Sequence, residues 1–159
     1  MTKTKQADWK LLLDCIQQSN RVYIIGNGGS AANAIHFAND LLSCGIKCHT
    51  LSADVATITA IGNDFGYEHI FSRQLVTLGD QGNLLIALSG SGNSPNIVAA
   101  IFAAHLSGMK TLAIVGEWKP SIAERLADNT IKYGENMQVA ENYQLELVHK
   151  VYRTLKGLK

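Results

Sequence analysis

The sequence holds only two prolines and three cysteines among its 159 residues. So few prolines leave no proline-rich linker between domains, and the chain has no low-complexity tract and no repeat of clear period. The three cysteines, Cys15, Cys44 and Cys48, cannot all pair with one another, and no close Cys/His pair completes a zinc site with them. We therefore expect reduced thiols, which are typical of a cytoplasmic protein.

Charge is also scarce, since only 17% of the residues are charged. The chain has 14 Lys plus Arg against 13 Asp plus Glu, a formal net charge of +1. This balance gives no electrostatic reason to bind nucleic acid or an anionic membrane. The apolar run LLLDCIQQ near the start is too short and too interrupted for a signal peptide or a membrane span. We expect a single globular domain over residues 1–159.

Short apolar runs alternate with helical patterns along the chain. The run NLLIAL, residues 83–88, has no polar alternation and is typical of a strand buried on both faces. We expect strands at residues 22–25, 47–51, 83–88, 111–115 and 129–132. We expect helices at residues 8–19, 30–42, 55–62, 69–78, 94–106, 122–127 and 138–156. This alternation predicts an α/β, three-layer, doubly wound fold with a five-stranded parallel sheet, which binds ligands beyond the carboxyl ends of its strands.

Two loops rich in glycine and serine follow two of these strands and open two helices: GNGGS at residues 26–30 and SGSGNS at residues 89–94. Glycine lets the backbone approach a ligand, and a helix N-terminus offers unpaired N–H groups and a partial positive charge. Two tight turns with good N-caps are the structural alternative. The pair of loops favours a phosphate cradle built from neutral donors. Neither loop is a P-loop, and Ala31 interrupts a dinucleotide-binding G-x-G-x-x-G pattern.

Histidines and carboxylates recur at helical spacing. His36 and Asp40 lie four residues apart and share a helix face one turn beyond the first loop. Glu141 and His149 lie eight residues apart on the last predicted helix, with Gln144 between them. Two histidines and two carboxylates suit zinc or a similar divalent ion. The alternative is that each of them is a solvated residue on a helix surface.

Three segments together resemble a known family: GNGGSAANAIHFANDL, TAIGNDFGYEHIFSRQ (residues 59–74) and ALSGSGNSPNIVAA (residues 87–100). They resemble the sugar isomerase (SIS) domain of bacterial phosphoheptose isomerases, from about residue 8 to the C-terminus. The resemblance implies the SIS fold and aldose–ketose isomerisation of a phosphorylated sugar, such as sedoheptulose 7-phosphate, through an enediol. It also implies a zinc or another divalent cation, heptose supply for surface polysaccharide, and a homotetramer or at least a dimer.

Apolar rows on the first and last predicted helices agree with an oligomer, because we expect a partner to cover them. The rows are Trp9, Leu12, Leu13 and Ile16, and Leu145, Val148, Tyr152 and Leu155. We expect substrate-binding residues in the two loops and at family positions between them. They are Asn27, Gly28, Gly29, Ser30, Asp54, Asn63, Asp64, Ser89, Gly90, Ser91 and Ser94. Asp54 is expected to contact sugar hydroxyls, and Asp64 to cap a turn.

The resemblance also implies roles for the histidines and carboxylates. In the family the matching positions carry a His, a Glu four residues later, a Gln, and a His eight residues further on. His36, Asp40, Glu141 and His149 are therefore the expected metal ligands, with Asp40 as the base, His149 as the acid and Glu141 as a second base. Asp40 is one methylene shorter than the family's Glu, and Glu141 replaces its Gln. A different register, in which Glu146 and His149 match the Gln and a middle His of the family, stays open.

These departures support a second hypothesis of another class. Some close relatives of phosphoheptose isomerases bind the replication initiator instead of catalysing. A non-catalytic SIS module that binds a sugar phosphate or such a protein partner would tolerate Asp40 and Glu141. Retention of both outer histidines, His36 and His149, favours catalysis, because a pure binding module does not need them.

Overall fold

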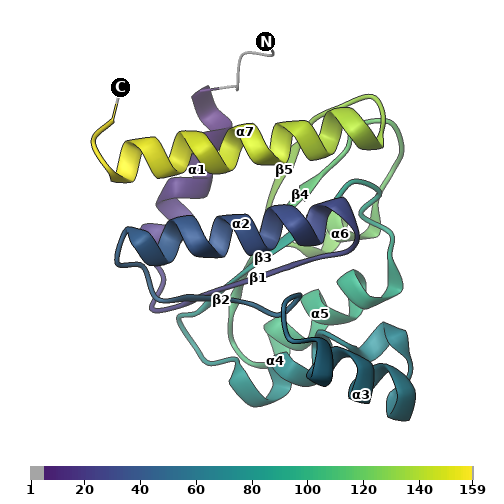
Figure 1. Cartoon of the computed structure of the whole chain (residues 1–159). Helices are drawn as coiled ribbons and strands as arrows, with labels where there is room; N and C mark the ends of the chain where they lie inside the picture. Colours follow the sequence, from purple (N-terminus) through teal and green to yellow (C-terminus); the bar gives the residue numbers. More distant parts are fainter. Residues whose placement is uncertain (1–5, 159) are drawn as a thin grey trace.

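The computed structural model describes residues 6–158, so residues 1–5 and 159 of the predicted domain lie outside the described part. Five strands form one parallel sheet in the order β2-β1-β3-β4-β5 (Figure 1). They are β1 (Val22–Gly26), β2 (Cys48–Thr50), β3 (Leu84–Ser89), β4 (Lys110–Val115) and β5 (Asn129–Lys132). The α/β fold with a five-stranded parallel sheet is thus confirmed.

Helices cover both faces of this sheet (Figure 1). On one face lie α1 (Gln6–Gln17), α2 (Gly29–Ser43) and α7 (Met137–Leu155). On the other lie α3 (Val55–Phe65), the short 3₁₀ helix η1 (Tyr67–His69), α4 (Ser72–Leu78), α5 (Pro95–Leu106) and α6 (Ile122–Leu126). Within residues 6–158, no helix combines the length and the apolar character that crossing a bilayer requires. All three cysteines are free.

The prediction of a single helix over residues 69–78 is wrong at its start. The chain forms η1 up to His69, turns at Ile70 and Phe71, and begins α4 only at Ser72. Ile70 and Phe71 are each 1% exposed and pack in the core beneath the sheet. Tertiary burial of these two side chains interrupts a helix that the local pattern alone would have continued.

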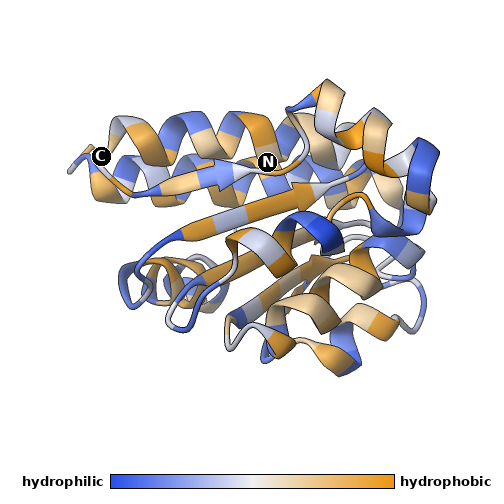
Figure 2. Ribbon diagram, turned by 90° about the horizontal axis from the view of Figure 1, so that it is seen from below, coloured by the Kyte–Doolittle hydropathy of each residue, from blue (hydrophilic) through white to orange (hydrophobic). Residues whose placement is uncertain are grey.

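Two apolar cores lie on opposite faces of the sheet, because successive strand side chains point to opposite sides. On β1, Val22 and Ile24 join the core beneath α1, α2 and α7, whereas Tyr23 and Ile25 join the other. Figure 2 shows apolar strands between helices that carry both polar and apolar residues.

Most members of the apolar rows of α1 and α7 belong to the first of these cores, all but Leu145 and Tyr152. Leu12, Ile16 and Val148 are completely or almost completely buried, and the remaining members of both rows are at least half-buried. The two helices contact each other directly, so each covers the apolar side of the other. The expectation that these rows need a second chain to cover them is therefore wrong.

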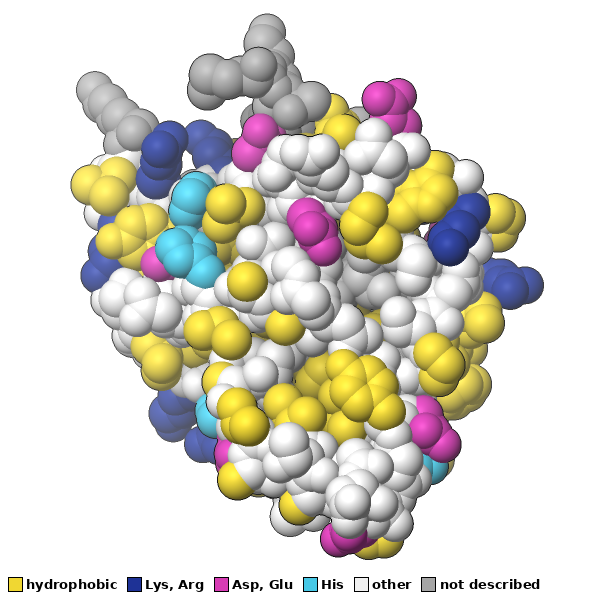
Figure 3. Space-filling model, turned by 45° about the vertical axis from the view of Figure 1, so that its right-hand side comes forward, with side chains coloured by type: hydrophobic (Ala, Val, Ile, Leu, Met, Phe, Trp, Pro, Cys, Tyr) yellow, Lys and Arg dark blue, Asp and Glu magenta, His cyan; other side chains and the backbone are white. Residues whose placement is uncertain are grey.

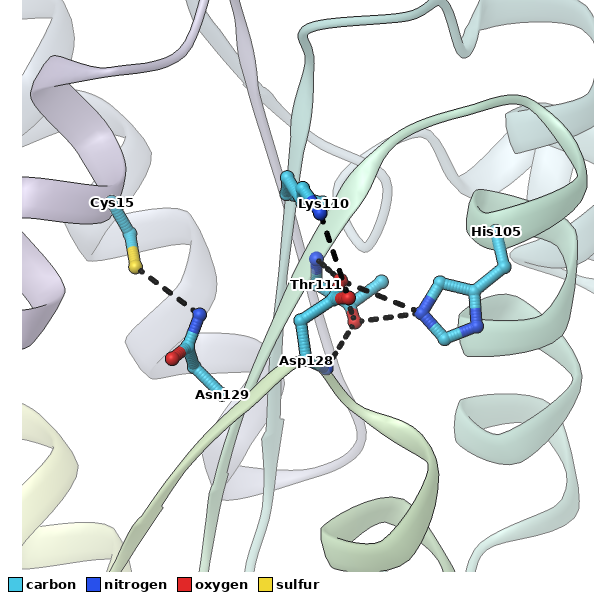
Figure 4. A network of polar contacts seen from close by, with 6 residues as sticks. All are labelled: Cys15, His105, Lys110, Thr111, Asp128 and Asn129. Carbon is cyan, nitrogen blue, oxygen red and sulfur yellow. Dashed lines mark hydrogen bonds and ion pairs between the residues drawn. The ribbon is translucent and has the colours of Figure 1, made fainter.

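A network of polar side chains lies at the edge of the sheet opposite the glycine-rich loops (Figure 4). The Asp128 carboxylate accepts hydrogen bonds from the Thr111 N–H (2.8 Å) and hydroxyl (3.0 Å), and the Asp128 N–H donates to the same hydroxyl (2.9 Å). His105, near the end of α5, places its Nε2 3.5 Å from the Asp128 carboxylate. Side chains thereby join the first residues of β4 to the chain entering β5.

This network shifts the ionisation of Asp128. Partial burial opposes the charged form, but the two hydrogen bonds from Thr111 and the charges of Lys110 and His105 outweigh it. The pKa of Asp128 therefore lies below its usual value.

We predict that Asp128→Asn lowers the free energy of unfolding at pH 7 by about 1–2 kcal/mol, because a neutral amide accepts weaker hydrogen bonds than a carboxylate. A depressed pKa in the folded state stabilises the protein above the unfolded value of about 3.9, and this contribution is lost as the pH falls through the folded pKa. Urea unfolding at pH 7 and near pH 3 should show the gap between variant and wild type closing in acid. Asp80→Asn, at an exposed position, is the control, and an equal gap at both pH values would contradict the assignment.

Candidate active site

The first loop needs its glycines for two different steric reasons. Gly28 has φ +55°, a conformation that residues with a side chain rarely adopt. Gly26 ends β1 with no room for a Cβ, which would lie 2.5 Å from the Ser30 carbonyl oxygen. The chain can therefore turn at once into α2, whose first N–H groups have no partner within the helix. These N–H groups and the nearby Ser30 hydroxyl make the end of β1 a suitable place for an anion.

The second loop prepares hydroxyl groups to act as donors. The Ser89 Oγ accepts a hydrogen bond from the Gly92 N–H (3.1 Å), and the Ser91 Oγ accepts one from the Asn93 N–H (3.2 Å). Each hydroxyl has thereby filled an acceptor position and keeps its own O–H to donate. Gly92, with φ +63°, allows the tight turn that brings these serines together.

The two loops meet around a cavity of about 220 Å³. It lies beyond the ends of β1 and β3, where the strand order of the sheet reverses and where ligands bind in such folds. Its lining consists of Asn27, Gly28, Gly29, Ser30, Leu88, Ser89, Gly90, Ser91, Ser94, Met137 and Glu141. Every residue predicted in the two loops is among them. No Lys or Arg occurs among these lining residues, so hydroxyl and N–H groups are the donors that face the cavity.

A reciprocal pair of amides joins the loops. The Asn27 Nδ2 donates to the Asn96 Oδ1 (2.9 Å), and the Asn96 Nδ2 donates to the Asn27 Oδ1 (2.8 Å). The Tyr67 hydroxyl adds a third bond to the Asn27 Oδ1 (3.2 Å). The amide of Asn27 therefore holds the loops at a set separation. The sequence patterns did not predict Asn96 or Tyr67. The signal for Asn96 was a polar side chain in the first turn of α5, a helix that is mostly apolar.

A second group of reactive side chains lies further along α2. The His36 Nε2 is 3.0 Å from the His149 Nε2 of α7 and 3.3 Å from the Asp40 Oδ2. One ligand atom from each of these three residues lies within 4.8 Å of the others. Figure 3 shows two histidine side chains in contact on the surface. We call His36, Asp40 and His149 the histidine cluster. Two imidazoles and one carboxylate are a donor set that zinc binds while keeping an open position.

The contact between His36 and His149 bears on the register of the last helix. His149 faces His36, which agrees with pairing Glu141 and His149 with the family's Gln and last His.

Glu141, the fourth expected ligand, is not in the histidine cluster. Its carboxylate lies so close to Gly29 that a Cβ added at Gly29 would overlap the carboxylate. Eight residues of α-helix rise about 12 Å, so Glu141 lines the cavity while His149 lies about two turns further along α7, in the histidine cluster.

Three predicted substrate residues lie elsewhere in the chain. Asp54 caps α3 by accepting hydrogen bonds from the Thr57 N–H (3.2 Å) and hydroxyl (2.6 Å). The Thr57 hydroxyl bond, and then the N–H bond, lower the pKa of this exposed carboxyl. Asn63 donates to Asp64 (2.8 Å) in the last turn of α3, so Asp64 lies within this helix and does not cap a turn as expected. None of these three lines the cavity between the loops.

The chain and its structure are similar to those of known proteins. Residues 5–116 match the family model described as SIS domain. The chain is 38% identical to the phosphoheptose isomerase of Thiobacillus denitrificans over 77% of its own length, and spans 65% of that relative. It is 36% identical to the phosphoheptose isomerase of Neisseria meningitidis serogroup C over 88% of its length, and spans 76% of that protein. The structure of the phosphoheptose isomerase of Neisseria gonorrhoeae aligns with a TM-score of 0.84 and 32% identity, covering 95% of this chain and 84% of the other.

We predict that replacing Ser91 and Ser94 together by Ala weakens binding of a sugar phosphate by roughly 1–3 kcal/mol, because hydrogen bonds to a charged group are lost. Isothermal titration calorimetry measures the change. Ser19→Ala is the matched control, since its Oγ donates to the Ile16 carbonyl at the end of α1, away from both loops. Unchanged affinity in the double variant would contradict a phosphate site here.

Proposed function

Because this chain belongs to the SIS domain family and is homologous to the phosphoheptose isomerases, we propose that it interconverts the aldose and ketose forms of a phosphorylated sugar. The substrate we propose is a heptose phosphate such as sedoheptulose 7-phosphate, in heptose supply for surface polysaccharide. The supporting observation is that a cavity lined by neutral donors and a histidine cluster lie on the same two helices, α2 and α7. We also propose a cytoplasmic location, in keeping with three free cysteines.

The substrate would extend along α2. Gly29 and Ser30, at the start of the helix, face the cavity, and His36 follows seven residues after Gly29. Seven residues of helix rise about 10 Å. A sugar with phosphate at one end and carbonyl at the other can therefore span this distance. Its phosphate would fill the cavity, and its carbonyl carbon and the adjacent carbon would reach the histidine cluster.

We propose that His36, Asp40 and His149 hold a divalent ion, most suitably zinc, because these side chains supply nitrogen and oxygen donors close enough to share one ion. When bound there, the ion polarises the sugar carbonyl and stabilises the negative charge that develops on its oxygen. The same three side chains also define the end of the cleft at which the carbonyl is held.

Proton transfer is assigned to side chains at that end. Asp40 takes the proton from the carbon next to the carbonyl and delivers it to the former carbonyl carbon. His149 gives a proton to the carbonyl oxygen and takes one from the hydroxyl on the adjacent carbon, which becomes the new carbonyl. Asp40 is a short base, and a misplacement of about 1 Å can cost about 10²-fold in rate. Glu141, whose carboxylate lies outside the histidine cluster, is the alternative base.

We propose that the chain assembles as a tetramer or at least as a dimer. The support comes from α3, in which none of the residues Val55–Phe65 is buried although most are apolar. Val55 is 71% exposed and Phe65 is 48% exposed. The same helix carries Asn63 and Asp64 and is capped by Asp54, all outside the cavity of their own chain. A second copy packed on α3 would cover its apolar face and bring these polar residues toward a neighbouring site.

The alternative function is a module that binds a sugar phosphate, or a protein partner such as a replication initiator, without catalysis. The comparisons do not favour it, because the relatives described above are isomerases. The isotope experiment below separates the two functions.

We predict that light scattering at micromolar concentration gives the mass of a dimer or a tetramer. Replacing the exposed apolar residues Val55 and Phe65 by Ser should shift the mass toward the monomer while the helical circular dichroism is kept. Leu106→Ser, at an apolar residue that is 88% exposed on α5, is the matched control. A strictly monomeric wild-type chain would overturn the proposed assembly.

We predict that His149→Ala abolishes exchange of the hydrogen next to the sugar carbonyl with deuterium oxide, and leaves phosphate affinity nearly unchanged, because His149 does not line the cavity. Exchange is followed by NMR on a zinc-loaded protein with a sugar phosphate that it binds. His105→Ala, at the opposite edge of the sheet, should exchange like the wild type. Comparing Asp40→Asn with Glu141→Gln identifies the base. A wild type that exchanges none of a panel of aldose and ketose phosphates would favour the binding module.

A further inference from the structure

Two amide side chains connect the helices that carry the candidate active site. The Asn33 Nδ2 of α2 donates to the Gln144 Oε1 of α7 (3.2 Å) and to the backbone carbonyl of Glu141 (3.0 Å). Gln144 is 1% exposed and Asn33 is half-buried, so this contact lies between the helices and is partly shielded from solvent. We call Asn33 and Gln144 the amide clamp.

The amide clamp lies between the two parts of the site. Asn33 precedes His36 by three residues, so both lie on the same side of α2. On α7, Gln144 stands three residues after Glu141 and five before His149. A shift of α7 along or around its axis would therefore move Glu141 and His149 together relative to α2.

Apart from the contact between His36 and His149 themselves, the other contacts between these helices resist such a shift poorly. Phe37 and Leu41 of α2 and Leu147 and Val148 of α7 belong to one apolar core, and apolar contact has no preferred direction. Hydrogen bonds depend on distance and angle. The bond to the Glu141 carbonyl sets the position of α7 along its axis, and the bond to the Gln144 side chain sets its rotation. A further polar contact, from the Lys156 Nζ to the Ser43 carbonyl, lies at the exposed far end of the pair.

Gln144 is a costly choice for this buried position. Its Nε2 is buried and has no hydrogen-bond partner among the described residues. A buried donor without a partner loses its hydration and gains nothing in return, whereas an apolar side chain of the same size avoids that cost. Folding stability alone therefore favours an apolar residue, so the reason for Gln144 must lie in the hydrogen bond that it accepts.

We infer that Gln144 is a positioning residue, which through Asn33 sets the register of α7 against α2 and so brings His149 to His36 and Asp40. The inference rests on the metal site of the proposed function. It assigns to Gln144 no contact with substrate or metal. Outer residues that orient metal ligands typically change metal affinity 10–100-fold when replaced.

The test compares Gln144→Met with the wild type in the full-length, metal-free protein titrated with Co²⁺. The dissociation constant and the visible absorption of bound Co²⁺ report the affinity and the coordination geometry. We expect Gln144→Met to bind Co²⁺ at least about 10-fold more weakly, with an altered spectrum, while its Tm equals or exceeds that of the wild type. Asn33→Ala removes this bond together with the bond to the Glu141 carbonyl, and should weaken Co²⁺ binding at least as much.

Gln74→Met is the matched control. Gln74 is a second buried glutamine, whose Nε2 donates to the Ile70 carbonyl (2.7 Å) and the Leu51 carbonyl (3.3 Å), on the other face of the sheet. This variant should lower the Tm and leave Co²⁺ binding unchanged. Equal Co²⁺ affinity in Gln144→Met and the wild type overturns the positioning role, as does a loss of affinity that only accompanies a falling Tm. A wild type that binds no Co²⁺ overturns the metal site of the proposed function, and the amide clamp with it.

Discussion

The packing of α7 against α2 is the constraint on which both parts of the candidate active site depend. Gly29 at the start of α2 meets the carboxylate of Glu141, and His36 two turns later meets His149. One pair of helices therefore aligns the cavity between the loops with the histidine cluster. Neither part is complete on a single helix, because each helix contributes residues to both. The spacing along the two helices sets the length of ligand that can use both parts.

The sheet supplies the second requirement, which is a fixed separation between the two loops. Parallel pairing of β1 with β3 ends both strands at the same edge of the sheet, so the loops that follow them meet. Asn27 and Asn96 then join the loops by two reciprocal hydrogen bonds. Because these amides bond to each other, the serine hydroxyls and the first N–H groups of α2 stay available to an anion. Neutral donors of this kind bind phosphate without a buried cation.

The candidate site and the Thr111–Asp128 hydrogen-bond network lie at opposite edges of the sheet. At the loop edge, Gly28 and Gly92 have positive φ and allow the tight turns that surround the cavity. At the other edge Thr111 and Asp128 bind each other through three hydrogen bonds, and His105 packs beside them. The two apolar cores between these edges hold the strands in register. This division leaves the carboxyl ends of the strands to serve binding, as is usual in α/β sheets.

The sequence by itself determined the elements and the residue types of the site. Apolar runs predicted the central strands β1, β3 and β4, which are buried almost throughout. Glycines and serines marked both loops, and a spacing of four residues put His36 and Asp40 on one helix face. Tertiary structure alone decided which distant residues meet. His149 faces His36 across 113 residues, Glu141 lies in the cavity instead of the histidine cluster, and Asn96 pairs with Asn27. Local patterns report the conformation of neighbouring residues, whereas contacts between distant segments depend on how the helices pack against the sheet and each other.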